Sequence, residues 1–165
     1  MTFRNDPRIM RRCVEIYAEY VQKLKGFINP EKFTTSLLFQ PIPSYMVAIG
    51  QRRGGNMLGL DDVNFNAVMF TAGFGVYPSE GEGKAALAYA ELMAMTAEVK
   101  KLSKLLNGEM DFIFLNYADA VQDPLGSYGL KNVQHMRQVA AGYDPTGVFQ
   151  TRIPGGFKIS RVKDQ

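Results

Sequence analysis

The chain has 165 residues, 46% hydrophobic and 21% charged, and its many Phe (11), Tyr (8) and Met (9) residues exclude a disordered protein. A single cysteine excludes a disulfide-rich scaffold, and no apolar run approaches the ~20 residues that cross a membrane. The net charge of +3 comes from scattered basic residues, which argues against a nucleic-acid partner. No apolar signal segment follows Met1, so we expect a cytoplasmic protein without membrane association.

The first predicted element is an amphipathic helix over residues 6–25. Asp6 suits the N-cap, Pro7 suits the first helical position, and Gly26 ends the helix. The apolar face repeats at three- and four-residue spacing and consists of Ile9, Cys13, Ile16, Tyr17, Tyr20 and Leu24. Because Cys13 lies on this face, we expect a small buried hydrophobic residue rather than a reactive thiol.

Four segments have the pattern of strands. They span residues 33–40, 45–49, 64–77 and 111–117. The first alternates, with Phe33, Thr35, Leu37 and Phe39 on one face. The last is almost wholly apolar, which predicts a central strand.

Two further helices are expected. Ser79 and Glu82 have the spacing of a capping box that opens a helix ending near Gly108. Its apolar stripe consists of Ala88, Leu92, Met95, Val99, Leu102 and Leu106. This stripe packs either on a sheet or on a partner helix. The final helix spans residues 130–142, with an inward face of Val133, Met136, Val139 and Ala140.

These elements predict an α+β fold: a mostly antiparallel sheet of about four strands with helices packed on one face. We expect one domain over residues 1–165. It consists of the helix over 6–25, the sheet and helices over 33–150, and an irregular tail over 151–165.

The sequence lacks the motifs of common cofactor and metal sites. One His and one Cys cannot form a standard zinc site, so no metal is expected, and His135 is expected to be solvated. The segment Gly81-Glu82-Gly83-Lys84 fails as a phosphate loop because Ala85 stands where Ser or Thr is needed. Asp61-Asp62 is expected to be a solvated turn.

Polar residues beside apolar strands are the remaining candidates for chemistry. Gln40, Asn66 and Asn116-Tyr117 adjoin predicted strands, and Asn56 follows two glycines. Such groups need hydrogen-bond partners, which are either internal or provided by a ligand in an apolar pocket.

Several sequence blocks carry a more specific signal. In chain order they are 35–43 (TSLLFQPIP), 54–61 (GGNMLGLD), 112–117 (FIFLNY), 122–129 (QDPLGSYG), Asn132, Val139, 143–150 (YDPTGVFQ) and 154–158 (PGGFK). Together they resemble the C-terminal part of fungal FAD-linked oxidoreductases of the berberine bridge enzyme-like family. The resemblance covers the chain from about Phe33 onward and corresponds to the later part of that family's substrate domain.

The resemblance implies a sheet that covers the flavin ring, with Asn116-Tyr117 near that ring. It places Phe114 where the family commonly has Tyr, so a phenol that acts as acid or base is missing there. The family's FAD-binding domain has no counterpart in this sequence. A sheet separated from that domain exposes an edge and an apolar face, so we expect a homodimer that buries both.

Three functions follow from the resemblance. The first is a stand-alone, flavin-free cyclase or isomerase, including cycloaddition-type chemistry, that acts on a hydrophobic natural-product intermediate. The second is a substrate-domain fragment or subunit of an FAD-dependent oxidoreductase whose FAD is supplied by a separate chain. The third is a non-catalytic small-molecule-binding protein.

The candidate site residues are those expected for the first of these functions. No residue is assigned to a cofactor or a metal. The catalytic candidates, which would hydrogen-bond developing oxyanions, are Asn116, Tyr117 and Tyr128. The substrate-binding candidates are Gln40, Asn56, Phe65, Asn66, Met69, Phe70 and Phe114.

Overall fold

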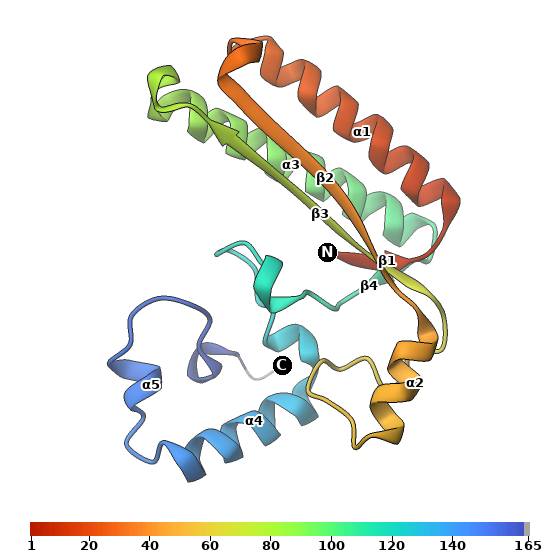
Figure 1. The fold of residues 1–165 in the computed structure, drawn as a ribbon, viewed down its shortest axis with the longest axis vertical. Helices are drawn as coiled ribbons and strands as arrows, with labels where there is room; N and C mark the ends of the chain where they lie inside the picture. The colour runs from red at the N-terminus through yellow and green to blue at the C-terminus, as the bar shows by residue number, and fades with distance from the viewer. Residues whose placement is uncertain (164–165) are drawn as a thin grey trace. The chain divides into compact units, whose positions relative to one another are not determined.

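The computed structural model describes residues 1–163, and these form two compact units (Figure 1). The sheet unit comprises residues 2–42 and 66–110. The coil-rich unit comprises residue 1, residues 43–65 and the chain from residue 111 onward. The expectation of a single domain stays a prediction.

The sheet unit alternates strands and helices in the order β-α-β-β-α-β. Its elements are β1 (Thr2–Arg4), α1 (Pro7–Lys25), β2 (Phe33–Ile42), β3 (Ala67–Val76), α3 (Glu82–Leu105) and β4 (Glu109–Met110). The sheet order is β2-β3-β1-β4, and every neighbouring pair is antiparallel. This is the split βαβ arrangement. The predicted α+β class with four antiparallel strands is confirmed.

Helix α1 forms where the sequence predicts it. The Asp6 carboxylate accepts a hydrogen bond from the backbone N–H of Arg8 at 2.8 Å, and Pro7 occupies the first turn. Hydrogen bonding to Arg8 lowers the pKa of Asp6 to about 2. Cys13 is fully buried on the apolar face. The prediction of a buried cysteine is therefore confirmed.

Helices α1 and α3 pack against each other and cover one face of the sheet (Figure 1). The Tyr17 hydroxyl of α1 donates a hydrogen bond to Thr35 Oγ1 of β2 at 2.5 Å. On the same face Phe70 lies between Phe39 and Phe3, with ring centroids 6.0 and 6.4 Å apart. These aromatic rings form the centre of the helix-covered core.

The start of α3 differs from the prediction. Ser79 lies in a 3₁₀ turn over Pro78–Glu80, and α3 begins at Glu82 after Gly81, with no side-chain cap. Gly81 has a φ of 85°, a value that glycine adopts without strain, so the backbone turns here without a capping box. The predicted apolar stripe is correct in its centre, where Ala88, Met95 and Val99 are buried.

Residues 45–49, predicted as a strand, lie in helix α2 (Ser44–Arg52). Short apolar runs do not distinguish helix from strand by periodicity alone. Pro43 has the extended conformation and precedes the first helical turn. Tyr45 and Met46 are more than half exposed, so the alternation did not mark a buried strand face.

Residues 111–117, predicted as a central strand, form no strand, and β4 (Glu109–Met110) ends directly before them. The physical reason is the length of the neighbouring strand. β1 pairs Thr2 with Met110, so Asp111 has only Met1 left beside it. The amide of Ile113 instead donates to Ser127 Oγ at 3.0 Å. A side chain thus replaces the missing sheet partner.

The coil-rich unit also contains α4 (Leu130–Tyr143) and α5 (Val148–Thr151). One cluster of buried residues in this unit consists of Val133, Ile159 and Val162. The tail is therefore not wholly irregular, because a 3₁₀ turn over Ile159–Arg161 packs near α4. Val139, predicted to point inward, is 45% exposed. Within residues 1–163 no helix is long and apolar enough to span a membrane.

Candidate functional site

The predicted site residues are divided between the two units. Those in the sheet unit are Gln40, Asn66, Met69 and Phe70. Those in the coil-rich unit are Asn56, Phe65, Phe114, Asn116, Tyr117 and Tyr128. The predicted site residues therefore form two subsets, one in each unit.

In the sheet unit, Gln40 and Met69 are direct partners across β2 and β3, on the face opposite the helices. Phe70 is the next residue and points to the other face, where it is 2% exposed in the core. Side chains alternate along a strand, so Met69 and Phe70 do not line one surface. The backbone carbonyl of Asn66 accepts a hydrogen bond from the Asn5 amide at 2.9 Å, which joins β3 to the start of α1.

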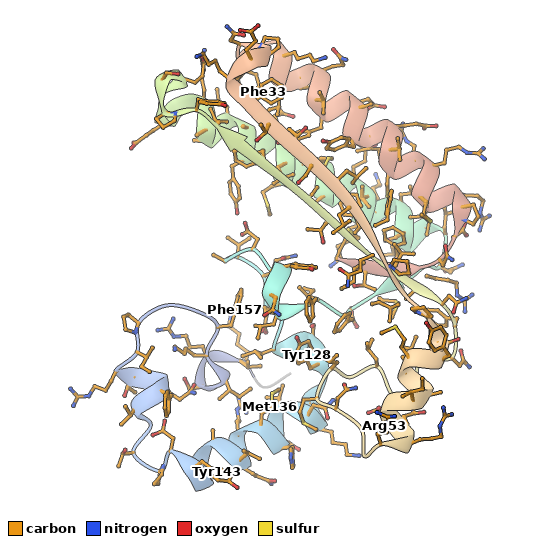
Figure 2. All side chains as sticks on the ribbon, in the orientation of Figure 1. Phe33, Arg53, Tyr128, Met136, Tyr143 and Phe157 are labelled. Carbon is orange, nitrogen blue, oxygen red and sulfur yellow. The ribbon has the colours of Figure 1, made fainter. Side chains whose placement is uncertain are left out.

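In the coil-rich unit, Tyr128 is buried and holds the segment before Tyr117 in place. Its hydroxyl accepts a hydrogen bond from the Leu115 amide at 3.2 Å. Its ring stacks on Phe112 at a centroid distance of 5.8 Å. Figure 2 labels Tyr128 at the end of the chain segment that leads into α4. Tyr128 is thus a positioning residue for the backbone of residues 112–115.

Residues 114–117 form a short turn that we call the aromatic corner. Its 3₁₀ turn, Leu115–Tyr117, leaves Asn116 and Tyr117 exposed, with Tyr117 at 48%. The rings of Phe114 and Tyr117 meet edge to face at 5.1 Å. This geometry is favourable for aromatic rings, and it presents an amide and a phenol side by side. The aromatic corner is the most compact group of predicted site residues.

The loop that carries Asn56 lies against the same part of the unit. The Asn56 Oδ1 accepts a hydrogen bond from the Leu58 amide at 2.8 Å, which forms a tight polar turn. Gly59 has a φ of 71°, and a Cβ there would collide with the Tyr128 carbonyl. Phe65, at the end of this segment, is partly buried. The structure therefore brings the Asn56 loop close to the Tyr128 backbone.

A cavity of about 650 Å³ lies elsewhere in the coil-rich unit, and sequence reasoning missed it. Its walls come from two segments that are far apart in the sequence. They are lined by Ala118, Ala120, Gln122, Asp123, Leu125, Gly156, Phe157, Lys158, Arg161, Val162 and Lys163. None of the predicted site residues is among them. The available signal was the repeated positive charge in the tail, at Lys158, Arg161 and Lys163.

The buried ionisable groups belong to the core rather than to a reactive site. Burial raises the pKa of the Cys13 thiol to about 12, so it is protonated at neutral pH. Burial also raises the pKa of Tyr20 to about 12. His135 is exposed on α4. In the part of the chain that the structure describes, no group of three or more His, Cys, Asp or Glu residues is arranged to hold a metal ion.

The chain is similar to part of two fungal proteins named FAD-dependent monooxygenase. It is 36% identical over 162 residues to the FAD-dependent monooxygenase drtC of Aspergillus calidoustus. The aligned residues cover 98% of this chain and 30% of that protein. It is 32% identical over 162 residues to the FAD-dependent monooxygenase tpcD of Cochliobolus heterostrophus, covering 96% of this chain and 30% of that protein. The chain is similar to one segment of a larger FAD-linked enzyme.

A third relative is the bifunctional solanapyrone synthase of Alternaria solani, 32% identical over 150 residues, which cover 91% of this chain and 27% of that protein. The chain thus spans about 30% of the length of the first two relatives. No protein-family profile matches the chain, and no solved structure matches it.

The glycine turn at the start of α3 does not fit the diphosphate of FAD. Gly81 and Gly83 leave open space, as a phosphate cradle would. However, the adjacent Lys84 is already paired with Glu80 at 2.6 Å, and Glu82 occupies the first helical turn. Carboxylates at this position repel a phosphate, so this turn is not a flavin-binding element.

Proposed function

We propose that this chain is the substrate-contacting segment of an FAD-dependent oxidoreductase of natural-product biosynthesis, with the flavin held by residues outside the chain. One observation carries the proposal. Nearly the whole chain is similar to a segment of enzymes named FAD-dependent monooxygenase, and that segment is only about 30% of their length. The resemblance of the sequence blocks to the berberine bridge enzyme-like family supports the same function.

The aromatic corner is the part of this segment that would contact the substrate. Phe114 and Tyr117 offer ring faces and edges to a flat hydrophobic molecule. Asn116 and the Tyr117 hydroxyl offer hydrogen bonds that orient a carbonyl or hydroxyl group of the substrate. Tyr128 and Ser127 fix the backbone of the preceding residues through the Leu115 and Ile113 amides. Such fixed donors orient a substrate without reorganisation during the reaction.

A complementation experiment tests this function. The monooxygenase drtC is expressed without its segment that aligns with this chain, and the chain is supplied as a separate polypeptide. We expect the truncated relative to recover bound flavin, seen by its visible absorption, and oxidation of its own substrate. The matched control supplies the relative's own segment in the same way. Rescue by that segment but not by this chain would refute the proposal.

The second candidate is the flavin-free cyclase or isomerase. The observation that favours it is the similarity to a relative named bifunctional solanapyrone synthase. In this case the chain alone would orient a hydrophobic polyene at the aromatic corner so that it closes a ring. The purified chain, colourless and without oxidant, would convert such a molecule, and Asn116→Ala would slow the conversion. A chain that binds the molecule but leaves it unchanged is the non-catalytic binding protein.

A further inference from the structure

The cavity of about 650 Å³ in the coil-rich unit is lined by both charged and apolar residues. The charged residues include Lys158, Arg161 and Lys163, and the apolar residues include Leu125 and Phe157. Figure 2 labels Phe157 in the segment between α5 and the end of the chain. Its volume lies within the roughly 300–1,000 Å³ that small-molecule sites occupy. The cavity therefore has the size and the mixed lining of a ligand site.

The three cations stand on an ordered segment rather than on a loose tail. Ile159 and Val162, which alternate with them, are buried against Val133 of α4. The side chain of Arg137 donates a hydrogen bond to the Val162 carbonyl at 2.6 Å. Gln150 Oε1 accepts a hydrogen bond from the Ser160 amide at 3.2 Å. The backbone that carries the cations is thus held by packing against α4 and by hydrogen bonds to Arg137 and Gln150.

The described lining of the cavity is rich in positive charge. Among the described residues, no ion pair includes Lys158, Arg161 or Lys163. Within residues 1–163, Asp123 is the one carboxylate of the lining, and its Oδ1 already accepts a hydrogen bond from the Gly126 amide at 2.9 Å. Among the described lining residues, three cations stand against one carboxylate, which is an excess of two positive charges.

We propose that this cavity binds a small molecule that carries a phosphate group on an apolar or aromatic body. A phosphate monoester is close to doubly charged at neutral pH and presents three acceptor oxygens. The forked guanidinium of Arg161 suits two of these oxygens, and the two lysines supply further charge. Leu125 and Phe157 would contact the body of the molecule. This site is independent of the proposed oxidoreductase function.

The test is calorimetric titration of the purified chain with AMP, phenyl phosphate, inorganic phosphate and phthalate. We expect saturable one-to-one binding of AMP or phenyl phosphate, tighter than that of inorganic phosphate. Arg161→Gln is expected to weaken it at least about tenfold, which corresponds to ~1.4 kcal/mol. The matched control is Arg152→Gln, an exposed arginine that does not line the cavity, and it should leave the affinity unchanged.

The outcomes separate cleanly. A preference for AMP identifies a nucleotide as the source of the phosphate, and a preference for phenyl phosphate identifies an aromatic phosphate ester. The absence of saturable binding, binding of inorganic phosphate only, or tighter binding of phthalate overturns the proposal. Equal weakening in the Arg161 and Arg152 variants also overturns it, because it would show charge attraction without a site. Circular dichroism confirms that both variants are folded.

Discussion

Two tyrosines on one face of α1 allow a test of the core. The same substitution, Tyr to Phe, is expected to stabilise the fold at one position and to destabilise it at the other. Tyr20 is 2% exposed, and within the described part of the chain its hydroxyl has no hydrogen-bond partner. Tyr17 lies 6.2 Å away between ring centroids, and its hydroxyl is bonded to Thr35. Replacement by Phe removes an unsatisfied hydroxyl at one position and a satisfied one at the other.

Burying a hydroxyl without a partner costs about 1–3 kcal/mol in proteins, so Tyr20→Phe is expected to stabilise the fold by about 1 kcal/mol or more. Tyr17→Phe removes a hydrogen bond worth about 0.5–1.5 kcal/mol and is expected to destabilise the fold by that amount. For a chain of this size, each kcal/mol shifts the melting temperature by roughly 2–4 °C. The two variants should therefore melt on opposite sides of the parent protein.

Calorimetry at pH 7 and urea unfolding measure both effects. A second readout is the alkaline range, because the pKa of Tyr20 rises from 10.0 in its ordinary state to about 12 in the fold. Because the hydroxyl ionises at a higher pH in the fold than in the unfolded chain, its ionisation leaves the free energy of unfolding unchanged below pH 10 and lowers it as the pH rises toward about 12. Tyr20→Phe should flatten this loss. If Tyr20→Phe destabilises the protein as much as Tyr17→Phe, the reasoning about the unpaired hydroxyl is wrong.

Three other substitutions test separate features. Gly59→Ala should destabilise the chain by about 1–3 kcal/mol more than Gly54→Ala in urea unfolding, because both have positive φ but only the first collides with a neighbour; equal costs would contradict this. Cys13→Ala should flatten the loss of stability between pH 9.0 and about 12, since burial raises the pKa of that thiol over this range; an unchanged alkaline slope would contradict it. The predicted homodimer should be seen by sedimentation, and Leu38→Lys, on the uncharged edge strand β2, should weaken it at least about tenfold, or ~1.4 kcal/mol. A parent chain that sediments as a monomer at micromolar concentration would refute the dimer.

The longer elements of the sheet unit were predictable because they are long enough to show a period. The helix over 6–25 has five buried residues at helical spacing, and β2 alternates between partly buried and exposed side chains. β1 was missed because three residues are too few for any pattern, although Phe3 is fully buried at its centre. Short strands are defined by their neighbours in the sheet, and a single sequence does not reveal those neighbours.

The coil-rich unit was less predictable because single hydrogen bonds between distant residues define its structure. The run from Phe112 to Tyr117 has the composition of a buried strand, but its amides bond to Ser127 and Tyr128. Helix α2 has the alternation of a strand without the burial of one. In both segments the local pattern is real, and the fold around it decides which structure forms.

The same reasoning explains which parts of the candidate site could be predicted. Phe114, Asn116 and Tyr117 were predictable as a group because they are adjacent in the sequence, and the structure keeps them together. Met69 and Phe70, both predicted to bind substrate, are adjacent in β3 and therefore lie on opposite faces of the sheet. The cavity was not predictable, because it exists only where the segment from Ala118 to Leu125 meets the segment from Gly156 to Lys163. A site built from segments this far apart depends on tertiary contacts such as that between Ile159 and Val133, so it can be found only in the folded chain.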